Sequence, residues 1–207
     1  MRHLTPAGWQ ALVDYGVRTI VDLRRHDELE RDPPFDVPVE VVHVPLQTEA
    51  DERDVQLVWR QEGDDAAGIR GAYTLMTEVL AANFARAVDA VAEAPDGGVV
   101  VHCFAGKDRT GLVCAMLLRL AGVGIEDIAA DYGLSGENIR PLIDPWAAAA
   151  GDEGERALRL RIGASPPQVM ADVVEALEQR HGDTRGYLLA AGARPDALDR
   201  ARARLLG

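Results

Sequence analysis

Residues 99–115 read VVVHCFAGKDRTGLVCA, and this stretch decides the fold. A short apolar segment, Val99–His102, has the composition of a β-strand and lacks alternation, so we expect it to be fully buried. Cys103 follows it, and a loop with glycine, lysine and arginine separates this cysteine from an apolar run at helical spacing over 110–121. The pattern predicts a strand, a tight loop and a helix, with a thiol where the strand ends.

The loop has the chemistry of an anion-binding site. The first N–H groups of a helix have no helical partner, and the helix dipole is positive at this end. Gly106 and Gly111 let the backbone curl, so that several N–H groups can converge on one tetrahedral oxyanion. Arg109 can add a bidentate contact to two oxygens. The sequence therefore predicts a phosphate cradle at the start of the helix.

Cys103 lies at the base of this cradle, where the same positive field would hold it as a thiolate aimed at phosphorus. His102 and Arg109 would assist, and so would Lys107, the single lysine among 22 basic residues. A cysteine at a strand end is more often a small buried hydrophobe. A nucleotide-binding loop or a rhodanese-type sulfur carrier does not account for His-Cys-x5-Arg-Thr-Gly, so a nucleophile is favoured.

Length and composition limit the wider possibilities. The chain has 207 residues, 47% of them hydrophobic, and a formal net charge of −12. We expect one globular domain over 1–207, and the acidic balance argues against nucleic acid as a partner. Two cysteines fit a reducing compartment. The sequence lacks a hydrophobic signal core and an apolar run of about 18 residues, which predicts a cytoplasmic protein without a transmembrane segment. Export by another route and the oligomeric state stay open.

Strand and helix signals alternate along the chain, which predicts an α/β fold with a mainly parallel central sheet flanked by helices and with additional C-terminal helices. We expect a charged turn at 24–34, an acidic surface loop with one short helix at 47–70, and a lid or surface insertion near 141–165. The expected strands are 17–23, 39–46 and 99–102. The expected helices are 5–16, 73–94 as one long helix, 110–121, 125–132, 166–177 and two short C-terminal ones.

The segment HCFAGKDRTG at 102–111 matches the HCxxGKxRTG loop of cysteine-dependent phosphatases, and with Asp at 108 it resembles the bacterial tyrosine phosphatase family. The segment LTPAGWQALVDYGVRTIVDLRRHDELERDP at 4–33 is similar to that family's N-terminal helix, strand and DLR turn. The segments ADYGLS at 130–135 and GYLLAAGARPDAL at 186–198 are also similar to family segments. The resemblance covers nearly the whole chain.

The resemblance implies that Cys103 is a nucleophile that forms a cysteinyl-phosphate, that Thr110 bonds the leaving sulfur, and that His102 orients the cysteine. It implies substrates that include phosphotyrosine, phosphoserine, phosphothreonine and phosphoinositides, and a reaction without cofactor or metal. The loop lysine is associated in this family with lipid headgroups. The implied substrate-binding residues are Phe104, Ala105, Gly106, Lys107, Asp108, Arg109 and Arg24.

The sequence offers two candidates for the general acid. Many cysteine phosphatases carry this aspartate on a loop after a strand, but here that strand ends VPLQT. The resemblance offers Asp108 as the acid, with Asp22 of the DLR turn as the alternative. Cys114 is interpreted as a core residue. A non-catalytic phosphate-binding pseudophosphatase is the alternative function, against which the complete set of Cys103, Arg109 and Thr110 argues.

Overall fold

The computed structural model describes residues 4–32, 37–61 and 65–207, and it has the predicted α/β architecture. The elements in chain order are α1 (Pro6–Asp14), β1 (Val17–Asp22), α2 (His26–Arg31), β2 (Glu40–His43), α3 (Glu49–Gln61), α4 (Asp65–Val79), α5 (Ala81–Glu93), β3 (Gly98–His102), α6 (Asp108–Ala121), α7 (Ile125–Asn138), α8 (Arg140–Ala148), α9 (Glu153–Gly163), α10 (Pro167–His181), α11 (Thr184–Ala190) and α12 (Pro195–Leu206).

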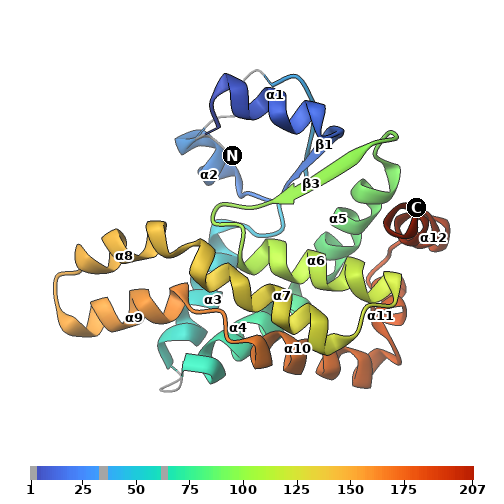
Figure 1. The fold of residues 1–207 in the computed structure, drawn as a ribbon. Helices are drawn as coiled ribbons and strands as arrows, with labels where there is room; N and C mark the ends of the chain where they lie inside the picture. The colour runs from blue at the N-terminus through green and yellow to red at the C-terminus, as the bar shows by residue number, and fades with distance from the viewer. Residues whose placement is uncertain (1–3, 33–36, 62–64) are drawn as a thin grey trace.

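The sheet is small, parallel and ordered β2-β1-β3. In the central strand, Val21 is aligned with Val42 of β2 and with Val101 of β3. Helix α1 packs on one side of the sheet, and α5 and α6 lie on the other (Figure 1). The expectation of a fully buried third strand is wrong. Because β3 is an edge strand, its valines are only half-buried, and β1 is the buried strand.

The short helix expected within 47–70 is confirmed, but the loop expected around it is wrong: the helix α3 extends over Glu49–Gln61, and α4 begins at Asp65. Residues 62–64 lie outside the described part. The Oγ1 of Thr48 accepts a hydrogen bond from the Asp51 N–H, and the Asp51 carboxylate accepts one from the Thr48 N–H. This reciprocal cap and the acidic first turn stabilise the N-terminus of α3. Val55, which is 1% exposed, anchors the helix in the core.

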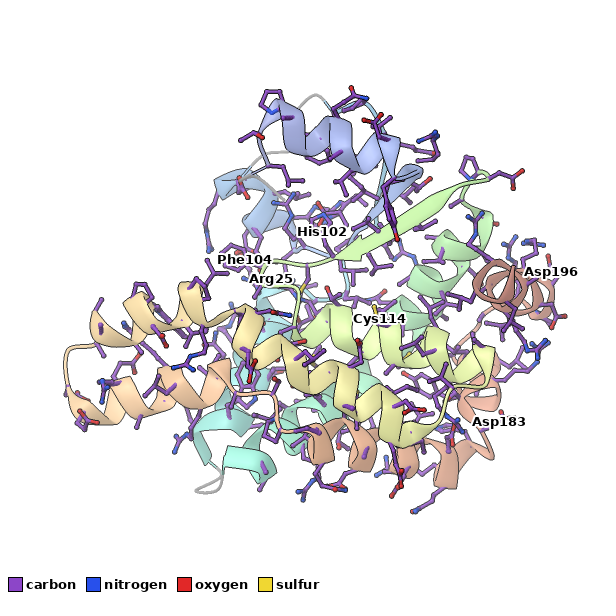
Figure 2. All side chains as sticks on the ribbon, viewed as in Figure 1. Arg25, His102, Phe104, Cys114, Asp183 and Asp196 are labelled. Carbon is purple, nitrogen blue, oxygen red and sulfur yellow. The ribbon has the colours of Figure 1, made fainter. Side chains whose placement is uncertain are left out.

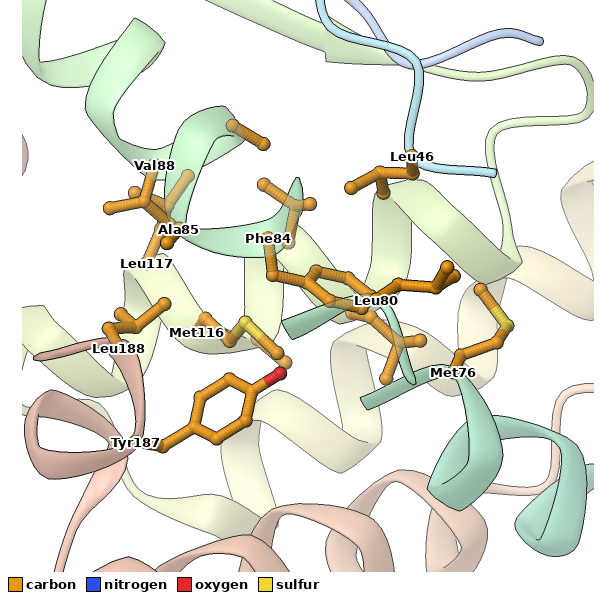
Figure 3. Packing of buried hydrophobic residues seen from close by; sticks show 14 of the residues in the cluster. Leu46, Met76, Leu80, Phe84, Ala85, Val88, Met116, Leu117, Tyr187 and Leu188 are labelled. Carbon is orange, nitrogen blue, oxygen red and sulfur yellow. The ribbon is translucent and has the colours of Figure 1, made fainter. Parts of the chain in front are cut away.

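The single long helix expected at 73–94 is interrupted at Leu80, which separates α4 from α5. A straight helix over these residues would be about 33 Å long. The interruption lets both halves turn the predicted apolar face to one core, where Met76 and Phe84 are both buried. Figure 3 shows these side chains packed with Met116 of α6 and Tyr187 of α11.

One other expectation is corrected, whereas the lid or surface insertion expected near 141–165 stays a prediction. The charged turn at 24–34 contains the helix α2, which begins after Arg25, although residues 33 and 34 lie outside the described part. The segment 141–165 is helical: α8 and α9 lie side by side and project from the rest of the molecule (Figure 1). Within the described ranges, no helix combines the length and apolar character needed to cross a membrane.

Candidate active site

The loop after β3 connects the carboxyl edge of the sheet to α6. Strands β1 and β3 are parallel, so both end at this edge, where ligands of open α/β sheets bind. Cys103 follows His102 directly and is 4% exposed. Gly106 has φ +76°, a left-handed conformation that side chains disfavour. Since α6 begins two residues later, the loop places a buried thiol close to a helix N-terminus.

Arg109 lies in the first turn of α6 and is held by α2. Its Nη1 and Nη2 donate to the two carboxylate oxygens of Glu28 at 2.6 and 2.8 Å. Both side chains are buried, at 9% and 6% exposure. The Glu28 carboxylate also accepts a hydrogen bond from the Arg25 N–H at 2.7 Å. This bidentate pair fixes the guanidinium against the end of the sheet.

The charge state of Glu28 follows from this arrangement. Burial alone would raise its pKa, but the hydrogen bonds and positive charge of Arg109 outweigh burial, so the pKa is lowered. Glu28 is thus a carboxylate that neutralises a buried arginine. Sequence analysis missed it; the available signal was an acidic residue six positions after the aspartate of the DLR turn.

Asp22 is locked by Arg24 at the end of β1. The Arg24 Nη2 donates to Oδ2 at 2.7 Å, and its Nε lies 3.0 Å from both carboxylate oxygens. Burial would raise the pKa of Asp22, but its hydrogen bonds with Arg24 and the positive charge that His102 carries when protonated in acid lower it. Arg24, expected to bind substrate, is 8% exposed and also donates to the Asp32 carbonyl. These two predicted site residues form a buried ion pair.

His102 lies between this ion pair and the thiol-bearing residue. Its Nδ1 lies 2.9 Å from the carbonyl oxygen of Cys103, which can only accept, so Nδ1 carries the hydrogen. Its Nε2 lies 3.6 Å from Oδ2 of Asp22, beyond hydrogen-bond distance. Burial lowers the pKa of His102 despite the nearby Asp22 charge. A neutral imidazole therefore fixes the backbone at Cys103.

Asp108 begins α6, and its carboxylate lies at the end of a pair of hydrogen-bonded tyrosines. The Tyr73 hydroxyl of α4 donates to Oδ1 at 2.5 Å, and that hydroxyl lies 2.7 Å from the hydroxyl of Tyr132 of α7. The Nζ of Lys107 lies 3.0 Å from the same Oδ1. The Asp108 side chain keeps 22% exposure, whereas the alternative acid Asp22 keeps 2%. Sequence analysis missed both tyrosines as site residues, although Tyr132 lies in the ADYGLS segment.

Lys107 lies inside the protein and points away from solvent. It is 1% exposed, and its Nζ donates to the carbonyls of Ile162 at 2.5 Å and Ala164 at 2.8 Å. These carbonyls belong to the end of α9, so the lysine ties the loop to this helix. Its expected contact with substrate stays a prediction.

The remaining loop residues differ in exposure. Phe104 is 58% exposed beside the half-buried Ala105, so the loop presents an aromatic ring at its mouth. Figure 2 labels Phe104, Arg25 and His102 around the end of β3. The Thr110 hydroxyl is buried, and in the described part of the chain it has no hydrogen-bond partner. It is therefore available to donate to another group, such as a sulfur.

Cys114 behaves as a core residue. Burial, with the nearby charges of Asp131 and Cys103, raises the pKa of its thiol to about 11. It is consequently a neutral thiol at physiological pH. Among the described residues, no group of three histidine, cysteine or acidic side chains is arranged to hold a metal ion.

Two curated proteins and one family model are similar to this chain in sequence. A curated "Tyrosine-protein phosphatase" of Nostoc commune is 29% identical over 216 aligned residues, which cover 98% of this chain and 71% of the relative. The "Triple specificity protein phosphatase PtpB" of Mycobacterium tuberculosis is 28% identical over 128 residues, covering 53% of this chain and 44% of that protein. A family model described as "Tyrosine phosphatase family" matches residues 1–207. The chain belongs to the tyrosine phosphatase family.

Proposed function

We propose that this phosphatase hydrolyses phosphate monoesters, phosphotyrosine above all, through a cysteinyl-phosphate on Cys103. The observation that carries the proposal is a buried cysteine at the end of β3, followed by a tight glycine turn and by Arg109 in the first turn of α6. Family membership supports a protein phosphatase. The chemistry below is what these groups can perform.

In the first step, the Cys103 thiolate attacks phosphorus. The S–P bond forms while the P–O bond breaks, and the bond pair leaves on the substrate oxygen together with a proton from a general acid. In the second step, water attacks phosphorus and gives one proton to the carboxylate that the general acid has become. The S–P bond breaks, and its electron pair returns to Cys103 as the thiolate. Thr110, whose buried hydroxyl has no recorded partner among the described residues, would donate to the departing sulfur.

Arg109 retains donors for the phosphate even though it is paired. A guanidinium has five N–H donors. Glu28 takes one from each Nη group, and Nη1 also donates to the Leu23 carbonyl at 3.5 Å, which leaves Nε and one Nη2 donor. The remaining donors and the loop N–H groups from Phe104 to Arg109 would bind the three equatorial oxygens. Glu28 therefore orients the arginine and leaves donors for the substrate.

Asp108 suits the general acid better than Asp22. The Asp22 carboxylate is 2% exposed, and both of its oxygens accept hydrogen bonds from Arg24. Among the described residues, Tyr73 and Lys107 contact the Asp108 carboxylate at Oδ1, and the side chain is partly exposed beside the loop. We therefore propose Asp108 as the acid.

The proposed substrate range is wider than phosphotyrosine. The name of the mycobacterial relative speaks of triple specificity, and the family resemblance implies phosphoserine, phosphothreonine and phosphoinositides. The exposed ring of Phe104 supports an aromatic substrate, since aromatic rings pack favourably against one another. A turnover panel of phosphotyrosine peptide, phosphoserine peptide and phosphoinositide vesicles would rank these classes.

The mechanism is tested with Cys103→Ser and the matched control Cys114→Ser. We expect Cys103→Ser to abolish turnover of an aryl phosphate measured in the presence of a chelator, while vanadate binding persists. Cys114→Ser should retain nearly full activity. Mass spectrometry of acid-quenched wild-type enzyme should find phosphate on Cys103. Vanadate binding by a wild-type protein that shows no turnover would instead identify a non-catalytic phosphate-binding protein.

A further inference from the structure

The contacts of Asp108 reach beyond the phosphate loop. Its Oδ1 accepts a hydrogen bond from the Tyr73 hydroxyl at 2.5 Å and lies 3.0 Å from the Lys107 Nζ. Tyr73 comes from α4, 35 positions earlier in the chain, and is 0% exposed. A fully buried hydroxyl must find a partner, and here that partner is the residue that we assign as the acid.

The direction of this hydrogen-bond chain follows from counting hydrogens. A tyrosine hydroxyl has one hydrogen, and that of Tyr73 goes to Asp108. The hydrogen between the two tyrosines must then come from Tyr132, whose hydroxyl lies 2.7 Å from that of Tyr73. Burial and the Asp108 charge raise the pKa of Tyr73, and the same two causes raise the pKa of Tyr132, so both remain donors at any physiological pH.

Tyr132 is itself placed against the start of α6. A Cβ added to Gly111 would lie 3.1 Å from Cδ2 of the Tyr132 ring, closer than ordinary packing allows. The glycine in the loop motif thus admits the ring beside the first turn of the helix. Two helices remote in sequence, α4 and α7, therefore bring a hydroxyl chain to one carboxylate.

The hydroxyl chain of Tyr132 and Tyr73 determines which oxygen of Asp108 carries the proton. A protonated carboxyl group has one carbonyl oxygen, which accepts, and one hydroxyl oxygen, which donates. Donors at Oδ1 make it the carbonyl oxygen and leave Oδ2 to hold the transferable proton. When that proton departs, the resulting carboxylate keeps both donors, and hydrogen bonds to a charged group are the stronger kind.

We propose that Tyr73 and Tyr132 are positioning residues that orient Asp108 for proton donation, an inference that rests on the proposed function. As the S–P bond forms, the P–O bond pair moves to the leaving oxygen, which takes the proton from Oδ2 of Asp108. Tyr73 stabilises the carboxylate that is left, and Tyr132 holds Tyr73 in place. The hydroxyl chain is needed most when the leaving group is a poor one.

The test compares three tyrosine-to-phenylalanine variants on two substrates, an alkyl phosphate and an activated aryl phosphate. Tyr73→Phe should lower kcat/KM for the alkyl phosphate about 10-fold or more, the effect of losing one hydrogen bond to a charged group. The loss for the aryl phosphate should be at most about 3-fold, because its leaving group needs little protonation. Tyr132→Phe should show the same selectivity with a smaller amplitude.

Tyr187→Phe is the matched control. Tyr187 is also a buried tyrosine, 4% exposed, but its hydroxyl donates to the carbonyl of Thr77. Its loss should affect both substrates equally. In an Asp108→Asn background, Tyr73→Phe should add no further selective loss, since residues that act as one unit are not additive.

Three outcomes would overturn the inference, and each is distinguishable. If Tyr73→Phe and Tyr132→Phe slow both substrates equally, as Tyr187→Phe does, the hydroxyl chain is only part of the core. If Asp108→Asn shows no leaving-group selectivity in an active enzyme, the acid is misassigned. If the wild-type protein hydrolyses neither substrate, the proposed function itself fails. If Tyr73→Phe does not fold, the same comparison of alkyl and aryl phosphate turnover in Tyr132→Phe tests the inference.

Discussion

At the scale of single residues, the pair Glu28–Arg109 shows how the site combines stability with function. Both side chains are buried, so each needs the other's charge. Removing one partner of a buried pair leaves an uncompensated charge, which costs about 3–5 kcal/mol. The two residues lie 81 positions apart. A sequence reading can identify the arginine from its own loop motif, but it cannot identify a partner brought in by folding.

We predict that Glu28→Gln lowers the free energy of unfolding at pH 7 by about 3 kcal/mol. The matched control is Glu52→Gln, which removes the 3.2 Å ion pair between Glu52 and Arg25. The Glu52 side chain is 22% exposed, so this variant should lower the free energy of unfolding by less than about 1 kcal/mol. Turnover should fall with Glu28→Gln, because Arg109 loses its fixed orientation. Urea unfolding and aryl phosphate hydrolysis measure the two effects.

The effect of pH follows from the lowered pKa of Glu28. A carboxyl group whose pKa is lower in the folded state stabilises the fold above its ordinary value of 4.5. That stabilisation is lost as the pH falls through the lowered folded value. The difference between wild type and Glu28→Gln should therefore be full at pH 7 and shrink in acid. An undiminished difference near pH 3 would contradict the ion-pair explanation.

At the scale of elements, the loop between β3 and α6 depends on one backbone conformation. A Cβ on Gly106 would meet nothing within 4 Å, so the cost of Gly106→Ala is backbone strain at φ +76° rather than a clash. Gly122, at φ +91° after the other end of α6, has equally open surroundings and is the matched control. We predict that each alanine variant loses about 1–2 kcal/mol of stability.

Only Gly106→Ala should also lose activity, since only that strain reshapes the proposed phosphate cradle. Thermal unfolding and kcat/KM for an aryl phosphate separate the two effects. Equal stability losses with equal retained activity in both variants would show that the curl of the loop is not needed for turnover.

The elements also show which parts of the fold could be predicted from the sequence. The strand, loop and helix of 99–121 were predictable because their signals are contiguous. The N-terminal cap of α3, formed by Thr48 and Asp51, is also a contiguous sequence signal for a helix start, but the acidic composition around it favoured a loop interpretation. The interruption at Leu80 has neither glycine nor proline to mark it, because it arises from packing α4 and α5 on one core.

At the scale of the whole molecule, long-range contacts complete the site. Its loop is one short segment, yet α2 supplies Glu28, α4 supplies Tyr73, and the end of α9 supplies carbonyls to Lys107 from 55 and 57 positions away. Such partners become visible only when the chain is folded. The sequence predicts that the single lysine contacts an anion; in the structure its Nζ donates to two carbonyls of the chain itself.

The last prediction concerns this lysine as a link between the loop and the pair α8–α9. Lys107→Met keeps much of the buried stem but removes the ammonium, leaving the carbonyls of Ile162 and Ala164 without this donor. An acceptor left unsatisfied costs about 1–3 kcal/mol when it is fully buried and less when it is part-buried, as here, so the end of α9 should separate from the loop more often.

Hydrogen exchange measured by mass spectrometry should therefore show faster exchange over 153–164 in Lys107→Met, while β1 keeps its protection. The matched control is Arg156→Met, the same loss of a cation on α9 itself, where the arginine is exposed and pairs with Glu153. It should leave exchange nearly unchanged, because an exposed ion pair contributes little. Equal exchange in both variants would mean that α9 is held by its apolar contacts, with Leu158 at 6% exposure as the anchor, and that Lys107 does not link loop and helix.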